Sequence, residues 1–191
     1  MNLPNRLTLL RILLSLLLIF VLLAPGLGAK VLALAIFVAA SLTDLWDGRF
    51  ARRRGLVTDF GILMDPIADK ILVLSAFVAF VQLQVAPAWM VVLIAAREFL
   101  VTGVRLFALG KGHLLPAEAS GKHKTASQMV AISLTLLFLI VREMVPAASQ
   151  YAQWVGWGGQ AVWGLIFLTV VLTLTSGISF LWRHRNLVLG L

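Results

Sequence analysis

Six apolar stretches, separated by short polar or Pro/Gly-containing segments, dominate the pattern of hydrophobic and polar positions along the chain. A helix of about 20 predominantly apolar residues crosses a bilayer, and stretches near this length recur here with few charges. The pattern therefore predicts an all-α membrane bundle with six transmembrane helices. We expect them over residues 7–23, 31–52, 61–85, 88–109, 125–141 and 160–181.

The second stretch is apolar only over its first part, from Val31 to Leu42. That is too short to cross a membrane alone. It crosses if its helix continues through polar residues to Arg52, since about 22 residues at 1.5 Å each reach roughly 33 Å. The polar half of this helix then lies at the membrane surface, together with the start of the third helix.

The first eleven residues mix polar and apolar positions and predict a short N-terminal interfacial helix. Pro4 suits the start of a helix. Arg6 and Arg11 favour the cytoplasmic side, with Arg11 reaching the membrane surface along its aliphatic stem. A secretory signal peptide with cleavage near Gly28 is the alternative interpretation. The hydrophobic stretches that follow favour a membrane helix.

The composition agrees with an integral membrane protein. Of the 191 residues, 61% are hydrophobic and 13% charged, whereas soluble domains are nearer half apolar and a quarter charged. In such a protein the net charge of +8 marks cytoplasmic loops and phosphate ligands, and we expect no nucleic-acid partner. The chain contains no cysteine, which excludes disulfides and thiol chemistry. We find no second domain and assign residues 1–191 to one membrane domain.

Acidic residues concentrate where the second and third helices meet. Four of the eight in the chain lie there: Asp44, Asp47, Asp65 and Asp69. Each pair is three or four residues apart and so points one way from its helix, and no Lys or Arg stands at those spacings. Two carboxylates about 4 Å apart repel by roughly 4 kcal/mol at an effective dielectric near 20. Four of them at one mouth need a cation, and their oxygens suit Mg²⁺ or Mn²⁺.

Small residues beside the aspartates leave room for a ligand close to the backbone, among them Gly48 and Gly61. Arg52, one turn beyond Gly48, can bind a phosphate with its planar fork. The competing interpretation makes the aspartates helix caps or surface ion pairs. It fits Asp65 best, because Pro66 could begin a helix. Ionisable residues beside apolar spans are functional by default, which favours a site.

The stretch from Asp44 to Asp69 reads D-x2-D-G-x2-A-R-x8-G-x3-D-x3-D. These residues and spacings resemble the signature of the CDP-alcohol phosphotransferases, membrane enzymes of phospholipid head-group synthesis. The resemblance implies that two divalent metal ions are held by Asp44, Asp47 and Asp65. Asp69 would share a metal ion and serve as the catalytic base.

The same resemblance implies that Gly48 and Arg52 contact the CDP moiety, with Gly61 beside them. The donor would be CDP-diacylglycerol, and an alcohol would displace CMP from it. The family also implies a homodimer.

The acceptor alcohol is predicted from charge first. Beyond the aspartates, the cytoplasmic side offers Arg105, Lys111, Lys122 and Lys124 and hardly any acid. Such a pocket favours a phosphorylated acceptor over a cationic one. Charge alone leaves both glycerol 3-phosphate and inositol phosphate open. The same cations could instead be ordinary positive residues of cytoplasmic loops.

Two further segments, 96–105 and 121–128, resemble family members whose acceptor is sn-glycerol 3-phosphate. This implies that Arg105, Lys122 and Lys124 bind the acceptor phosphate. Arg97 and Glu98, inside the fourth apolar stretch, are equally well interpreted as a structural ion pair, because buried charges usually find partners.

A divalent-cation transporter is the alternative outside the enzymes, because acidic residues in a six-span protein can line an ion path. A transporter needs acids along a path through the bilayer, whereas both aspartate pairs are expected at one face. The Lys and Arg residues at that face orient it toward the cytoplasm. The sequence thus predicts a multi-pass protein of the cell (inner) membrane with its active site on the cytoplasmic side.

Overall fold

In the computed structural model every regular secondary-structure element among the described residues is an α-helix, which confirms the all-α class. The structure describes residues 3–54, 59–110, 119–146 and 150–185, without the side chains of 3–5, 44–54, 59–63, 65 and 119–123. The helices are α1 (Leu3–Leu23), α2 (Leu27–Arg54), α3 (Asp59–Gln82), α4 (Ala88–Gly110), α5 (Ala119–Met144) and α6 (Ala152–Arg183).

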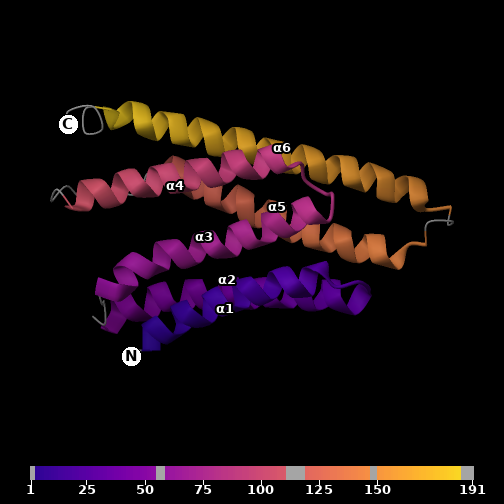
Figure 1. Cartoon of the computed structure of the whole chain (residues 1–191), viewed down its shortest axis with the longest axis horizontal. Helices are drawn as coiled ribbons and strands as arrows, with labels where there is room; N and C mark the ends of the chain where they lie inside the picture. Colours follow the sequence, from indigo (N-terminus) through magenta and orange to yellow (C-terminus); the bar gives the residue numbers. More distant parts are fainter. Residues whose placement is uncertain (1–2, 55–58, 111–118, 147–149, 186–191) are drawn as a thin grey trace.

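Successive helices run in opposite directions, so their ends collect at two ends of an elongated bundle (Figure 1). α1 packs against α2 and α3, and α6 packs against α4 and α5. α2 and α3 also contact α5, which joins the two groups. The last turns of α2 and α4 and the first turns of α1, α3 and α5 lie at one end, on the left of Figure 1. We call this the terminal end, because both ends of the chain also lie there.

The turn between α1 and α2, at the opposite end, follows from local sequence. Gly26 has a φ of 94°, a left-handed conformation that glycine adopts without strain. The buried ammonium of Lys30 donates hydrogen bonds of 2.8 Å to the carbonyl oxygens of Leu22 and Ala24. These bonds satisfy carbonyl groups that the end of α1 leaves without helical partners.

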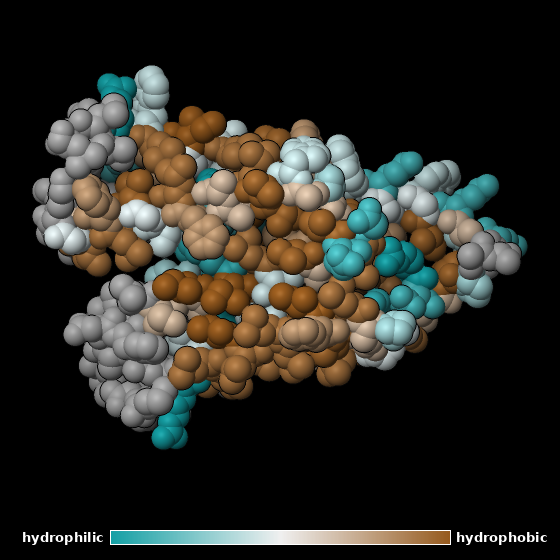
Figure 2. Space-filling view, viewed as in Figure 1, coloured by the Kyte–Doolittle hydropathy of each residue, from teal (hydrophilic) through white to brown (hydrophobic). Residues whose placement is uncertain are grey.

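Apolar side chains fill the core and also cover the outside. The core draws on all six helices, from Leu18 in α1 to Val170 in α6. Figure 2 shows a hydrophobic belt across the middle of the molecule, with hydrophilic residues collected toward its ends. In the described part of the chain, three helices are long and apolar enough to cross a membrane: Arg6–Leu23, Lys124–Met144 and Ala152–Arg183. The chain is therefore a membrane protein with several apolar helices.

The structure corrects three expected boundaries. The interfacial helix expected over residues 1–11 is not a separate element, because α1 is continuous from Leu3 to Leu23. α5 begins at Ala119 and α6 at Ala152, several residues before the starts that hydropathy predicted. Extending a helix adds one hydrogen bond per residue, so polar residues beside an apolar span join its helix. Lys122 and Lys124 consequently belong to α5 and not to a loop.

Candidate active site

The two aspartate pairs lie on neighbouring helices at the terminal end. Asp44 and Asp47 fall in the second half of α2, and Asp65 and Asp69 in the first half of α3. α2 and α3 contact each other, and Figure 1 shows the last turns of α2 beside the first turns of α3. The backbone thus brings both pairs to one end of the bundle. Of the four side chains, the structure describes that of Asp69.

The course of α3 excludes the interpretation of Asp65 as a helix cap. The helix begins at Asp59 and contains Pro66 in its interior, so Asp65 is not its N-cap. Proline has no N–H and cannot bond to the carbonyl four residues earlier. The carbonyl oxygen of Pro66 itself accepts a hydrogen bond of 2.9 Å from Lys70 Nζ. The bounds of α3 place Asp65 within the helix, one turn before Asp69.

Asp69 is bonded to an arginine from α1. Arg11 Nη1 donates a hydrogen bond of 2.7 Å to Asp69 Oδ1. The Arg11 side chain is 1% exposed and that of Asp69 is 51% exposed. The expectation that Arg11 reaches the membrane surface is wrong, because its guanidinium ends inside the bundle on a carboxylate. The charge of that carboxylate compensates a cation that would otherwise be costly to bury.

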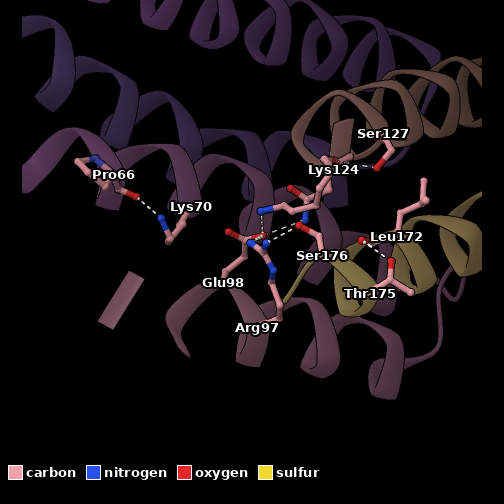
Figure 3. Close-up of polar contacts among 10 residues, drawn as sticks. Pro66, Lys70, Arg97, Glu98, Lys124, Ser127, Leu172, Thr175 and Ser176 are labelled. Atoms are coloured by element: carbon pink, nitrogen blue, oxygen red, sulfur yellow. Dashed lines mark hydrogen bonds and ion pairs between the residues drawn. The ribbon is translucent and has the colours of Figure 1, made fainter. Parts of the chain in front are cut away.

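A second polar site lies among α4, α5 and α6 around Glu98 (Figure 3). Glu98 Oε1 accepts a hydrogen bond from Lys124 Nζ and another, of 3.2 Å, from Gln128 Nε2. Arg97 Nη1 lies 3.6 Å from the same oxygen. Glu98, Lys124 and Gln128 are all buried. The ion pair expected between Arg97 and Glu98 is present, and Lys124 joins it.

Arg97 extends from α4 to α6. Its Nη2 donates a hydrogen bond of 2.9 Å to Ser176 Oγ. A Cβ atom at Gly177 would lie 2.7 Å from Arg97 Cγ, so the glycine gives this side chain its room. Arg97 Nε is buried and finds no hydrogen-bond partner among the described side chains.

Arg105 lies about two turns beyond Arg97 on α4. Its guanidinium carbon is 5.2 Å from the centroid of the Phe180 ring of α6, a cation–π contact. Arg105 Nε is likewise buried and has no hydrogen-bond partner within the part of the chain that the structure describes. A buried N–H of this kind costs free energy until a partner satisfies it.

Lys70 links this group to the aspartates. It follows Asp69 in α3 and interacts electrostatically with Asp69 and with the charged side chains of α4. We define the basic cluster as Lys70, Arg97, Arg105 and Lys124. These four cations and the Glu98 carboxylate together carry a net charge of about +3 when all are ionised. An excess of positive charge on buried and half-buried side chains favours the binding of an anion.

Comparison with known proteins decides the family. The sequence profile of CDP-alcohol phosphatidyltransferase matches residues 1–175. The chain belongs to the CDP-alcohol phosphatidyltransferase family. This confirms the resemblance that the aspartate motif predicted.

Relatives of this CDP-alcohol phosphatidyltransferase share much of its length. It is 40% identical over 182 residues to the CDP-diacylglycerol–glycerol-3-phosphate 3-phosphatidyltransferase of Bacillus subtilis (strain 168), covering 89% of this chain and 90% of that protein. It is 36% identical over 191 residues to the protein of the same name from Salmonella choleraesuis (strain SC-B67), covering 97% and 96%. The similarity thus extends well beyond the aspartate motif.

Several predicted site residues of this CDP-alcohol phosphatidyltransferase have side chains outside the described set. They are Asp44, Asp47, Gly48, Arg52, Gly61, Asp65 and Lys122. Among the side chains that are described, no three His, Asp or Glu residues come together as a metal site. The side chains of Asp44, Asp47 and Asp65 are not among those described, so the metal-binding role of the motif aspartates stays a prediction.

Four residues of the polar site around Glu98 and Asp69 were not predicted from the sequence, and two of them could have been. Lys70 directly follows Asp69, and Gln128 stands four residues after Lys124 on one face of α5, so spacing could have indicated both. Ser176 and Gly177 carry no signal in a hydropathy pattern. Their role depends on how α6 packs against α4, which the sequence alone does not reveal.

Proposed function

We propose that this chain transfers the phosphatidyl group of CDP-diacylglycerol to sn-glycerol 3-phosphate, giving phosphatidylglycerophosphate and CMP. Relatives about 40% identical over most of the chain carry this activity in their names. The structural observation that supports the acceptor is the basic cluster, in which Arg97 and Lys124 contact the single Glu98 carboxylate and Lys70 and Arg105 add two further cations. An acceptor with its own phosphate supplies the anion that this cluster lacks.

The aspartate motif forms the donor site in this proposal. Asp44, Asp47 and Asp65 would hold two divalent ions, Mg²⁺ or Mn²⁺, and Asp69 would share one of them. Carboxylate oxygens are the ligands that these ions prefer, and the Asp69 side chain is half exposed. Such ions would supply positive charge to a bound diphosphate and to the phosphate of the leaving nucleotide.

The CDP moiety lies along the last turns of α2. Gly48 and Arg52 are four residues apart in that helix and so share a face. Arg52 binds a phosphate of the nucleotide with its guanidinium, and Gly48 lets the nucleotide approach the backbone. Gly61 plays the same part on α3.

Asp69 acts as the general base. It accepts the proton of an acceptor hydroxyl, whose oxygen attacks the phosphatidyl phosphorus as the bond from that phosphorus to the CMP oxygen breaks. CMP leaves with the electron pair of that bond, and the proton stays on Asp69 until solvent removes it. The side chain is 51% exposed, which permits that exchange.

The acceptor phosphate binds to the basic cluster and to Lys122. Arg105 and Arg97 each contain a buried Nε for which the described residues supply no hydrogen-bond partner. Arginine binds a phosphate with two parallel hydrogen bonds, while lysine acts as a point charge. Glu98 holds Lys124 in place before the acceptor arrives. Inositol phosphate would meet the same cations, and the relatives' names favour glycerol 3-phosphate over it.

The alternative outside the enzymes, a divalent-cation transporter, is disfavoured by the family match over residues 1–175. Membership of a transferase family explains the motif aspartates without an ion path through the bilayer.

We also propose that all six helices cross the membrane, with the terminal end in the cytoplasm. The shortest helix has 21 residues and the longest 32, enough for a bilayer. Trp154 and Trp157 at the start of α6 and Trp182 at its end are exposed, as expected at the two membrane surfaces. A homodimer, which the family resemblance implied, completes the proposal.

An acceptor panel tests the proposed reaction. The purified protein is given CDP-diacylglycerol, Mg²⁺ and one acceptor at a time: sn-glycerol 3-phosphate, inositol phosphate, free inositol or serine. We expect kcat/KM for glycerol 3-phosphate to exceed that for the uncharged and zwitterionic acceptors by at least about tenfold, the effect of one charged hydrogen bond. A preference for serine or free inositol would refute the assignment. A preference for inositol phosphate would keep the chemistry and change the acceptor.

A further inference from the structure

Arg11 lies on the most deeply buried face of α1. That face follows a regular three- and four-residue spacing and is 0–1% exposed throughout: Thr8, Arg11, Ser15, Leu18 and Leu22. Its polar members are at the terminal end, where the aspartates lie, and its apolar members are farther along the helix. A helix face that only packs against its neighbours normally carries apolar residues at every position. The buried Arg11 on this face therefore indicates a specific polar interaction.

The partner in this interaction is Asp69. The distance of 2.7 Å from Arg11 Nη1 to Asp69 Oδ1 is that of a charge-assisted hydrogen bond. It joins residues 58 positions apart in the chain, so it depends on the packing of α1 against α3. Both helices are closely packed at this point, because Ala68, directly before Asp69, is 0% exposed, as is Arg11 itself.

We propose that Arg11 is a positioning residue for Asp69, which orients the carboxylate of the catalytic base toward the acceptor. The inference rests on the role of Asp69 in the proposed function. A charge-assisted hydrogen bond from a buried guanidinium to Oδ1 restrains the rotation of this carboxylate. The exposures of the two side chains agree with a positioning role, because that of Arg11 is buried and that of Asp69 is half exposed.

The alternative is that the pair only stabilises the bundle. The two accounts differ in what the loss of Arg11 does to kinetics. A positioning role lowers kcat and leaves the binding of both substrates nearly intact, because a small displacement of a catalytic group can cost up to about 10² in rate. A purely structural role lowers the amount of folded protein, and the folded fraction then turns over at the parent rate.

The test compares Arg11→Met, Arg11→Gln and Arg11→Lys with the parent, with Arg6→Met as the matched control on the exposed face of the same helix. We expect Arg11→Met and Arg11→Gln to lower kcat about tenfold or more, with both KM values within about threefold of the parent. Binding of CDP-diacylglycerol without acceptor should stay at the parent level. Arg11→Lys, which keeps the charge and a donor, should recover part of kcat, and Arg6→Met should match the parent.

A double-mutant cycle with Asp69→Asn makes the inference specific. Once the base is gone its orientation no longer matters, so adding Arg11→Gln to Asp69→Asn should cause no further loss in a sensitive radiolabelled CMP assay. An equal loss on both backgrounds, or a parent kcat in both Arg11→Met and Arg11→Gln, would overturn the positioning role. If Arg11→Met fails to fold, Arg11→Gln and Arg11→Lys carry the comparison. Parent-like activity of Asp69→Asn itself would instead refute the proposed base, whatever the Arg11 variants do.

Discussion

Glu98 shows, at the scale of a single residue, how this apolar bundle accommodates charge. One carboxylate oxygen serves two cations and an amide from two helices. Such an arrangement satisfies the carboxylate and still leaves the cations with charge to spare, which suits a site that must take up an anion. We infer that the same residues that hold α4 against α5 also prepare the acceptor site.

Arg105 tests the acceptor site most cleanly, because its described partner is an aromatic ring and not the Glu98 carboxylate. Arg105→Ala should raise the KM for glycerol 3-phosphate about ten- to a hundredfold, which corresponds to the loss of a charged hydrogen bond of roughly 1.5–3 kcal/mol. The KM for CDP-diacylglycerol should barely change. Arg142→Ala, in the last turn of α5 at the opposite end, is the control. Equal effects on both substrates would place Arg105 outside the acceptor site.

Asp69 tests the proposed base. Asp69→Asn keeps an oxygen that can accept the Arg11 hydrogen bond but removes the basic carboxylate. Turnover should fall by roughly 10² or more, while CDP-diacylglycerol still binds, as direct binding to the purified protein would show. A variant nearly as active as the parent would exclude Asp69 as the base.

The sequence predicted residue identities well where a motif fixes them and poorly where packing does. The four aspartates could be singled out because their spacing places them on helix faces. The partner of Asp69 could not, because Arg11 lies in another helix and its burial depends on α1 packing against α3. Packing also determines the partner of Lys124, which is buried against Glu98 of α4.

At the scale of helices, too, some features could be predicted from the sequence and others could not. Their number and order follow from the apolar stretches, and all six were predicted. Their ends were less predictable, because hydropathy ends where polar residues begin and hydrogen bonding continues the helix past that point. α6 is the clearest case, since it starts at Ala152 and runs to Arg183.

The contact between α4 and α6 gives a prediction at this scale. Gly177→Ala places a methyl group 2.7 Å from Arg97 Cγ, so Arg97 must move. We expect the KM for glycerol 3-phosphate to rise about tenfold, as for the loss of one charged hydrogen bond. Gly164→Ala on the same helix is the matched control, because nothing lies within 4 Å of its Cβ position. If the two variants have the same kinetic constants, Arg97 does not contribute to the acceptor site.

At the scale of the whole molecule, the antiparallel order of the helices places both ends of the chain on one side of the bundle (Figure 1). The absence of cysteine makes the proposed orientation directly testable. In intact cells, a membrane-impermeant maleimide should label Gln150→Cys, at the opposite end, and should label Arg185→Cys only after permeabilisation. The reverse pattern would place the aspartates outside the cell and contradict the proposed topology.

In the proposed function, a metal-loaded aspartate site and a basic acceptor site together make phosphatidylglycerophosphate. An assay of purified protein with CDP-diacylglycerol and sn-glycerol 3-phosphate can follow CMP and the lipid product, first in EDTA and then with Mg²⁺ or Mn²⁺ restored. We expect no turnover in EDTA, and CMP and phosphatidylglycerophosphate in equal amounts once metal is added. Full turnover in chelator by protein that retains no metal, or CMP release without that lipid product, would refute the proposed function.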